Sequence, residues 1–379
     1  MQSRFMFLLF GLLFSNYCSS STDTDPYAPL VSAKGYLIMD YNSGQIIANV
    51  NGDQRLEPAS ITKVMSAYVV FAALKKGTVK LTDLVTISAK SSAKRGSRTF
   101  LKAGSKVQLE TLVKGMIVQS GNDAAIALAE HIAGDEDIFV GLMNREANNL
   151  KMRSSNFVNV TGLPTSNHYT SARDMAKLAR AMIRDFPEYY KYYSIKQFTH
   201  AGVAQQNRNT LLFTDSRVDG LKTGYTKSAG YCLLASARKG ARRLITVVLR
   251  DNGGKDRAES SKTLMDYGFK GFAVKRVVKK LRPLTQIRVY GGHKRLVSAG
   301  ILKDSFLTLR KKFTGKIRFS YNYLPKLSAP IKKNHTKVGT LTISLDNNVV
   351  SEHTLIALED INKGGWLHRT ADKLLLLNK

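Results

Sequence analysis

The stretch Leu56-Glu-Pro-Ala-Ser60-Ile-Thr-Lys63 leads directly into an apolar run that decides how this chain begins to fold. The run reaches Lys75, has apolar residues at helical spacing and contains Ala and Met, which together predict a helix over 61–75. Side chains three residues apart share one face of a helix, so the Ser60 hydroxyl would lie beside the Lys63 amine. The stretch therefore predicts a helix that starts with a serine and a lysine side by side.

Strands are predicted on both sides of a mostly helical middle segment. The turn Tyr41-Asn-Ser-Gly44 joins the first two strands, and Lys239-Gly240 joins the last two as a hairpin. The predicted strands are 34–40, 45–50, one beginning at 218, 230–237 and 242–250. The other predicted helices are 109–118, 123–132, 136–150, 171–184 and 256–268. This order predicts an α+β fold with one antiparallel sheet, built from both ends of the domain and covered by helices.

The pattern changes from about Val277 to short runs of period two, such as Thr340-Leu-Thr-Ile-Ser-Leu345. Such runs predict a separate, small all-β domain at the C-terminal end. The sequence thus predicts four segments, namely a signal peptide over 1–20, the α+β domain over 21–275, a β-rich domain over 276–362 and an amphipathic tail over 363–379.

The N-terminus is typical of an export signal, with Arg4, an apolar run over 5–14 and then several serines. This run is too short for a membrane-spanning helix, which needs roughly 20 residues. Tyr17 is large where a lipoprotein signal has a small residue, so lipid attachment at Cys18 is disfavoured. Cleavage after Ser20 would leave one cysteine, Cys232, in an apolar run where we expect a buried structural thiol.

The formal net charge of +30 indicates an anionic partner. The excess is strongest from Val277 onward, with 20 Lys/Arg against 6 Asp/Glu, which suits an anionic membrane surface or wall polymer. Nucleic acid is disfavoured because an exported protein rarely meets it and few aromatic residues lie among the cations. The tail over 363–379 mixes Trp366, leucines and cations, as an interfacial helix requires. The alternatives are a compositional bias for the charge and a docked terminal helix for the tail.

Ser60 and Lys63 have the residue types for nucleophilic catalysis. A serine hydroxyl is a poor nucleophile until another group takes its proton. Neutral lysine can take it, provided that its pKa falls well below the ordinary value of about 10.4. Burial and a second cation, for which Lys222 is the candidate, would both lower that pKa. Taken alone, this pair is also what a helix-capping serine followed by an exposed lysine would give.

Two further strings, Ser120-Gly-Asn122 and Lys222-Thr-Gly224, supply the remaining groups that such a reaction needs. Ser120 lies at a predicted break between helices, where it could relay a proton to a leaving amine while Asn122 holds a substrate amide. Lys222 and Thr223 could bind a carboxylate, and Gly224 would permit close approach of a substrate backbone. Two arginines, Arg208 and Arg250, are further candidates for that carboxylate because arginine suits bidentate binding.

No single string is specific, because S-x-x-K also occurs at Ser91/Lys94 and Ser236/Lys239, and S-x-N at Ser154/Asn156. Neither of the additional S-x-x-K strings precedes an apolar helix. K-T-G occurs once. The order, wide spacing and local context of the three strings therefore carry the inference, and together they match the S-x-x-K, S-x-N and K-T-G set of the penicillin-recognising serine enzymes.

The chain resembles the low-molecular-mass penicillin-binding proteins of the D-alanyl-D-alanine carboxypeptidase type. The likeness covers about 34–271, with a weaker likeness through the β-rich domain and tail. Beyond the three strings, it rests on Glu57-Pro-Ala-Ser60, Phe157-Val-Asn-Val-Thr-Gly-Leu-Pro164, His168-Tyr-Thr-Ser-Ala-Arg-Asp174 and Val218-Asp-Gly-Leu-Lys222. It implies the β-lactamase/transpeptidase-like α/β/α sandwich as the fold of the main domain.

The resemblance implies a role for each candidate residue. Ser60 would be the acyl-ester nucleophile, Lys63 its proton acceptor, and Ser120 with Asn122 a relay and positioning pair. Lys222 and Thr223 would bind the terminal carboxylate of the substrate with help from Arg208, and Gly224 would also belong to the substrate-binding site. The oxyanion hole would be formed by the backbone N–H groups of Ser60 and Tyr225, where some members of the family carry histidine.

The implied reaction removes the terminal D-alanine from peptidoglycan pentapeptide stems, with β-lactams as covalent inhibitors and with no metal or cofactor. The implied location is the periplasm, at the outer face of the inner membrane. A D,D-endopeptidase that cleaves cross-links would share all three strings and stays open. A class A β-lactamase is disfavoured because it needs a glutamate near 156–159, where the chain reads Asn-Phe-Val-Asn. An inactive wall-binding scaffold is also disfavoured, because none of the motif residues is substituted.

Overall fold

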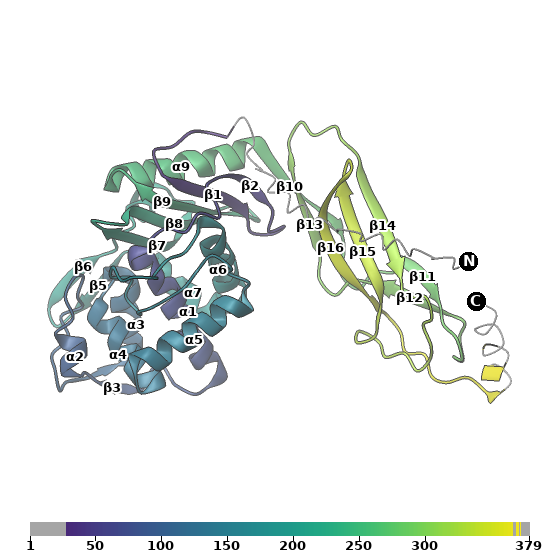
Figure 1. Ribbon diagram of the computed structural model, residues 1–379, viewed down its shortest axis with the longest axis horizontal. Coiled ribbons are helices and arrows are strands. Elements are labelled where there is room, and N and C mark those ends of the chain that lie inside the picture. The colour runs from purple at the N-terminus through teal and green to yellow at the C-terminus, as the bar shows by residue number, and fades with distance from the viewer. Residues whose placement is uncertain (1–27, 367–368, 371, 373–379) are drawn as a thin grey trace, which may run out of the picture.

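The computed structural model describes residues 28–366, 369, 370 and 372. The predicted signal peptide, Cys18 and most of the predicted tail lie outside these residues. In Figure 1 a larger N-terminal body of helices and strands and a smaller C-terminal body of strands lie end to end. The predicted boundary between residues 275 and 276 falls inside strand β10 (Phe272–Val278), and the domain limits stay predictions.

The N-terminal body is organised on a five-stranded antiparallel sheet in the order β2-β1-β9-β8-β7. Its strands are β1 (Gly35–Asp40), β2 (Ile46–Val50), β7 (Val218–Thr226), β8 (Gly230–Lys239) and β9 (Arg242–Asp251). The first two strands come from the start of the chain and the other three from beyond residue 217, which confirms the predicted α+β sheet built from both ends.

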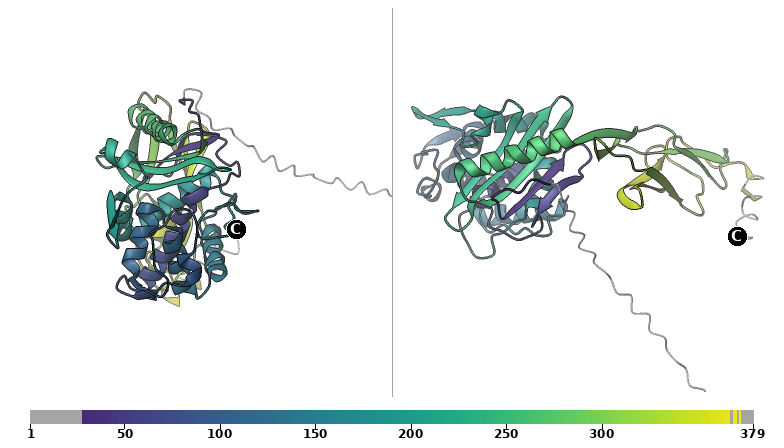
Figure 2. Two further views of the ribbon diagram at one scale, coloured as in Figure 1. Left: turned by 90° about the vertical axis from the view of Figure 1, so that its left-hand side faces the viewer. Right: turned by 90° about the horizontal axis from the view of Figure 1, so that it is seen from above.

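Helices cover both faces of this sheet (Figure 1). On one face lies α9 (Gly254–Gly271), whose Leu264, Met265 and Phe269 pack against Ile38 and Val248. Figure 2 shows α9 running across the sheet. The other face carries the remaining main helices, α1 (Lys63–Lys76), α3 (Leu109–Lys114), α4 (Asn122–Ala133), α5 (Glu136–Asn149) and α6 (Ala172–Asp185). The result is a helix–sheet–helix sandwich.

Helix α1 runs through the middle of the larger helical layer. Eleven of its 14 residues are buried, Lys63 among them. A helix that is apolar on nearly all sides is stable only when other elements surround it. It ends at Gly77, which adopts the left-handed conformation. The predicted helix over 61–75 is thus confirmed, but its first turn, Ala59–Thr62 (η1), is a 3-10 turn.

The shorter elements of the N-terminal body form its periphery. Two small hairpins pair β3 (Leu84–Thr86) with β4 (Lys106–Gln108), and β5 (Gln197–His200) with β6 (Val203–Gln206). The short helices are α2 (Ala89–Ser92), α7 (Pro187–Tyr190), the 3-10 helix η3 (Lys191–Ser194) and α8 (Leu211–Thr214). A π-helical turn, η2 (Gly115–Gln119), follows α3, where the sequence predicted continuous α-helix to residue 118.

The C-terminal body is all β, as predicted, and has its own apolar core. A five-stranded sheet runs β11-β12-β16-β15-β14, and a separate pair joins β10 to β13. The strands are β11 (Thr285–Arg288), β12 (Leu296–Gly300), β13 (Ser305–Arg310), β14 (Ile317–Tyr323), β15 (Lys337–Leu345) and β16 (Asn348–Ala357). The main-chain N–H of Thr308 donates to the side chain of Gln45, which ties β13 to the start of β2.

The described part of the tail is docked on this sheet body. The Asp372 carboxylate accepts hydrogen bonds from the Gly291 N–H at 2.7 Å and from the Arg288 guanidinium at 3.1 Å. Trp366, in contrast, is 69% exposed. Within the described residues, none of the helices combines the length and apolar character that crossing a membrane requires.

Candidate active site

The Lys63 amine is the centre of the site. Its Nζ donates to Ser60 Oγ at 3.2 Å, to Asn122 Oδ1 at 2.7 Å and to the Thr161 carbonyl at 2.7 Å. The lysine is 1% exposed, so its charge is almost completely removed from water. Structure and sequence agree that Ser60 and Lys63 lie side by side, and the structure adds Thr161, which the sequence alone did not single out.

Burial is the main cause of an unusual Lys63 pKa. Desolvation disfavours the charged amine and lowers its pKa to about 7, with a further lowering from the Arg208 charge and an opposing effect of Asp123. Close to neutral pH, a substantial fraction of this lysine is therefore neutral and able to accept a proton. We expected Lys222 to be the second cation, whereas the main charge that opposes Lys63 protonation belongs to Arg208.

Ser120 and Asn122 lie at the break between η2 and α4. Ser120 has a φ of 67°, in the left-handed region, and its Oγ is buried without a hydrogen bond to any described protein group. The neighbouring Gly121 has an ordinary φ, but a Cβ there would lie 2.2 Å from Thr99 Oγ1. The glycine is thus required for close packing, and the serine carries the backbone strain.

The Asn122 amide is bound on both sides. Its Oδ1 accepts from Lys63, and its Nδ2 donates to the Arg95 carbonyl at 2.7 Å. The next residue, Asp123, is fully buried and accepts the N–H groups of Thr99 and Leu101. These bonds hold the segment around residues 95–101 against the start of α4, so the position of Asn122 is fixed from two directions.

The Lys222-Thr-Gly224 string lies on β7, the edge strand that faces the Ser60 turn. A Cβ on Gly224 would lie 2.9 Å from the Pro58 carbonyl and 3.1 Å from the Ser60 nitrogen. The glycine therefore lets the strand pack against the chain's own Ser60 turn, and its role in the approach of a substrate backbone stays a prediction. Lys222 is 2% exposed, and burial together with the Lys63, Arg208 and Arg257 charges lowers its pKa well below the ordinary value.

Two arginines were proposed for carboxylate binding, and of these Arg208 is the one whose charge lowers the pKa of both Lys63 and Lys222. It is exposed, donates to the Gln119 carbonyl at 3.3 Å and lowers the pKa of Lys63 and Lys222. Arg250 is exposed, and its charge is not among the causes of the Lys222 shift. Tyr225 is 54% exposed and packs its ring 4.4 Å from that of Tyr231.

Arg257, on α9, is a positioning residue that sequence reasoning missed. Its guanidinium donates to the Gly224 carbonyl at 2.8 Å and to the Cys232 carbonyl at 3.4 Å, and it lies over the Tyr231 ring. It thus braces β7 against β8 directly behind the K-T-G string. No short motif surrounds it, so only the packing of α9 on the sheet could have identified it.

The loop over 151–170 brings the Thr161 carbonyl to Lys63. Gly162 has a φ of +81°, and a Cβ there would lie 1.8 Å from the Ala59 carbonyl oxygen, so only glycine fits. Thr62 Oγ1 and His168 Nε2 lie 2.9 Å apart, and the Val158 N–H donates to His168 Nδ1 at 3.0 Å. Burial and the Lys63 charge lower the His168 pKa to about 4, so the ring is neutral at neutral pH.

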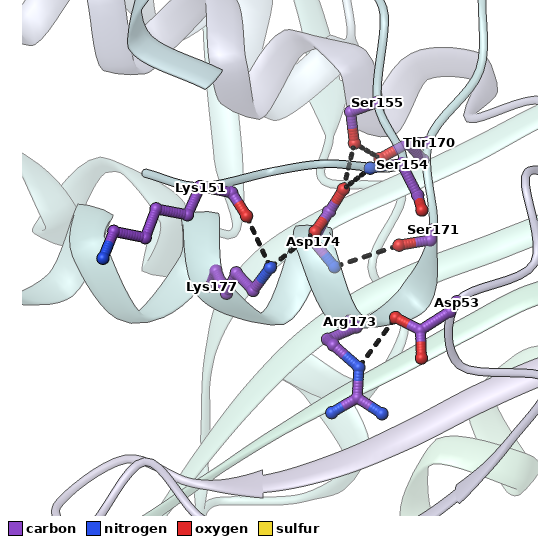
Figure 3. Close-up of polar contacts among 9 residues, drawn as sticks. All are labelled: Asp53, Lys151, Ser154, Ser155, Thr170, Ser171, Arg173, Asp174 and Lys177. Atoms are coloured by element: carbon purple, nitrogen blue, oxygen red, sulfur yellow. Dashed lines mark hydrogen bonds and ion pairs between the residues drawn. The ribbon is translucent and has the colours of Figure 1, made fainter. Parts of the chain in front are cut away.

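Asp174 anchors the other side of this loop (Figure 3). Its carboxylate accepts from the Ser154 N–H at 2.7 Å and from Ser155 Oγ at 2.9 Å, and Lys177 pairs with it at 2.9 Å. Ser171 caps α6 by accepting the Asp174 N–H. The segment His168–Asp174, which carried part of the family resemblance, is therefore a structural brace for the site.

The competing strings have structural roles. Ser91 Oγ donates to the Asp123 carbonyl, and Ser236 Oγ contacts the Arg243 guanidinium. Cys232 is fully buried, and burial raises the pKa of its thiol to about 11, as expected for a structural cysteine. The described residues contain no cluster of His, Cys, Asp and Glu that could hold a metal ion.

Comparison with known proteins identifies the family. The D-alanyl-D-alanine carboxypeptidase family model, Peptidase S11, matches residues 22–253, and the C-terminal domain model of penicillin-binding protein 5 matches residues 272–363. The chain belongs to the D-alanyl-D-alanine carboxypeptidase family. The resemblance inferred from the sequence is thereby confirmed.

The sequences and structures of known relatives match this carboxypeptidase over most of its length. It is 40% identical to D-alanyl-D-alanine carboxypeptidase DacA of Escherichia coli K12 over 360 residues, which cover 93% of this chain and 89% of the relative. The solved structure of penicillin-binding protein 5 from Haemophilus influenzae is 39% identical, with a TM-score of 0.81 over 88% of this chain and 99% of that one. Penicillin-binding protein D2 from Listeria monocytogenes, solved with ampicillin bound, gives 26% identity and a TM-score of 0.57 over 64% of this chain and 98% of that one.

These matches support a serine-type D-alanyl-D-alanine carboxypeptidase, a hydrolase of cell-wall peptides. They also support the penicillin-binding protein fold, with its α+β core and all-β C-terminal domain. Within this carboxypeptidase, Lys63 donates hydrogen bonds to both Ser60 and Asn122, and Gly224 packs against the Ser60 turn.

Proposed function

We propose that Ser60 removes the terminal D-alanine from peptidoglycan pentapeptide stems through an acyl-enzyme. The observation that carries this proposal is the buried Lys63 amine, 3.2 Å from Ser60 Oγ and with its pKa lowered to about 7. A lysine in this state can take the hydroxyl proton as the oxygen attacks, which is the activation that a serine nucleophile needs.

The proposed reaction has two halves. Ser60 Oγ forms a bond to the carbonyl carbon of the penultimate D-alanine, its proton passes to Lys63, and the C–N bond to the terminal D-alanine breaks. Ser120, whose hydroxyl is buried and unpaired among described protein groups, would pass a proton to the leaving amine. Water then attacks the ester carbonyl, and Ser60 regains its proton as the shortened stem leaves.

The remaining candidate residues would hold the substrate. Lys222, Thr223 and Gly224 line the strand against which the terminal carboxylate would bind, with Arg208 adding positive charge at the rim. The N–H groups of Ser60 and Tyr225 would stabilise the oxyanion. A β-lactam presents a similar carbonyl and carboxylate, so we infer that it acylates Ser60.

We also propose that the enzyme is exported to the periplasm and attaches peripherally to the outer face of the inner membrane through its tail. This proposal rests on the N-terminal apolar run, the basic C-terminal quarter and the exposed Trp366. The second candidate function, a D,D-endopeptidase that cleaves cross-links, would use the same groups.

The deciding experiment measures D-alanine release from a soluble peptide that ends in D-Ala-D-Ala, with the wild type and Ser60→Ala in parallel. Release by the wild type alone supports the proposal. Release by neither protein, together with cleavage of cross-linked dimers by the wild type, would favour the endopeptidase. A labelled penicillin should remain bound to the wild type after denaturation and should not label Ser60→Ala.

A further inference from the structure

A cationic groove lies along α6, at the opposite edge of the sheet from β7. The cavity has a volume of about 390 Å³. Its charged lining is Lys151, Arg173, Lys177, Arg180 and Arg184, and its other lining residues are Met39, Gly44, Ile46, Asn149, Leu150 and Ala181. None of these lining residues is acidic, so the described wall of the groove offers an anion only cations, amide groups and apolar surface.

The four α6 cations form one stripe. Arg173, Lys177, Arg180 and Arg184 are separated by four, three and four positions, which places them on a single face of the helix. At a rise of about 1.5 Å per residue, the stripe is about 16 Å long. Like charges at this spacing destabilise a helix. The length suits an extended partner with several negative groups better than one small anion.

Part of this charge is neutralised by carboxylates beside the groove. Arg173 pairs with Asp53 at 2.8 Å, Lys177 with Asp174 at 2.9 Å, and Arg184 with Asp185 at 2.6 Å. Figure 3 shows the first two pairs, and it shows the Lys151 side chain extending away from the Asp174 cluster. Lys151 and Arg180 form no ion pair with a described carboxylate, which leaves the groove with a positive excess.

Arg180 is also held in a fixed position. Its Nε donates to the Tyr41 carbonyl at 2.8 Å and its Nη2 to the Asn42 carbonyl at 3.2 Å. Gly44, with a φ of +76°, leaves room for the guanidinium, because a Cβ there would lie 2.6 Å from Arg180 Nη1. The turn between β1 and β2 thus orients this arginine before any ligand arrives, which reduces the entropy lost on binding.

We propose that this groove binds a carboxylate-bearing strand of the cell-wall polymer while another stem of that polymer occupies the active site. The inference rests on the proposed function, because every uncleaved stem of a carboxypeptidase substrate ends in a free carboxylate and a polymer carries many stems. Strand β1, which bears Met39, is three strands away from β7, or about 14 Å at the usual spacing. The groove and the serine can therefore be occupied together, and the groove raises the local concentration of stems.

The test compares a soluble D-Ala-D-Ala peptide with isolated, uncross-linked peptidoglycan polymer as substrates of the full-length enzyme. Lys151→Gln combined with Arg184→Gln removes two exposed groove cations that lie outside the segment His168–Asp174, and it should lower kcat/KM about tenfold on the polymer and leave it unchanged on the peptide. The matched control, Lys76→Gln with Lys80→Gln, removes two exposed cations from another part of the same domain. It should keep polymer turnover close to the wild-type value.

Three outcomes would overturn the proposal. These are an equal loss on polymer for both double variants, an equal loss on both substrates for the groove variant, and unchanged turnover of the polymer. Cosedimentation of Ser60→Ala protein with the polymer, with and without the groove substitutions, tests the groove even if D-alanine release fails altogether. If the substitutions abolish binding to phosphatidylglycerol vesicles and spare binding to the polymer, the groove is a lipid site and the proposal is wrong.

Discussion

The active site and the C-terminal sheet body both depend on cations but hold them in opposite ways. Lys63 and Lys222 are 1% and 2% exposed, and both have a lowered pKa. From Val277 onward, by contrast, 20 Lys/Arg stand against 6 Asp/Glu, and most of the described lysines there are exposed. A buried amine becomes a proton acceptor, whereas exposed amines act together as a surface field. Environment, rather than residue type, therefore assigns the role.

Removal of the buried Lys63 amine should have the largest effect on catalysis. Lys63→Met should lower kcat/KM for peptide hydrolysis by about 10³-fold or more, because Ser60 loses its proton acceptor. The matched controls are Lys94→Met and Lys239→Met, in the two competing S-x-x-K strings, and both should stay close to the wild type. A loss for Lys63→Met of less than tenfold would contradict the assigned role. Thermal unfolding of each variant checks that it is folded.

The pH dependence of the reaction follows from the same lysine. Only neutral Lys63 can accept the proton, and its pKa is about 7. Protonation on the acid side therefore inactivates the enzyme, so log kcat/KM should rise with pH at a slope close to one and level off above about pH 7. An acid limb centred near pH 4 would instead indicate a carboxylate base or the neutral His168 ring.

Arg208 combines features of the buried and the exposed cations. Its side chain is exposed, but its charge lowers the pKa of the buried Lys63 and Lys222. Arg208→Ala should lower kcat/KM about tenfold through weaker binding of the terminal carboxylate. The same change should move the acid limb to higher pH, because a charge that lowers the Lys63 pKa is lost. Arg250→Ala is the matched control. An unchanged pH profile for Arg208→Ala would show that the Arg208 charge does not lower the Lys63 pKa.

The smallest effect on catalysis is expected from removal of the C-terminal tail and its cations. A protein that ends at Gly364 should turn over the soluble peptide within about twofold of the wild type, because no residue of the tail contacts the site in the described structure. It should lose binding to anionic vesicles, as an interfacial tail with Trp and cations would. Neutral vesicles serve as the control. Equal vesicle binding with and without the tail would place the membrane contact elsewhere.

Much of the N-terminal body could be predicted from the sequence because its signals are local. The strands next to Tyr41–Gly44, the long apolar helix after Ser60 and the capped helix after Ser171 each follow from spacing and turn chemistry. Local pattern also brought Ser60 together with Lys63. Asn122 and Lys222 are distant from that pair in sequence. They were linked to it by the order, spacing and local context of the three strings.

Other parts of the site could not be predicted from the sequence because they depend on tertiary contacts. The Thr161 carbonyl is a main-chain group, and its approach to Lys63 depends on the packing of Gly162 against Ala59. Arg257 acts from a helix on the far face of the sheet. The left-handed Ser120 was missed because propensity assigns such a conformation to the adjacent glycine.

The place of β9 in the sheet determines when the central sheet of this enzyme can be completed. β9 lies between β1 and β8, so it joins the N-terminal hairpin to the paired strands β8 and β7, and β7 carries Lys222. Gly35 of β1 pairs with Leu249 of β9, near the end of the N-terminal body. Contacts so far apart in sequence form slowly during folding. A nascent chain that has not reached β9 therefore lacks the strand that joins the N-terminal hairpin to β8 and β7, so the central sheet is completed only when most of the N-terminal body has been synthesised.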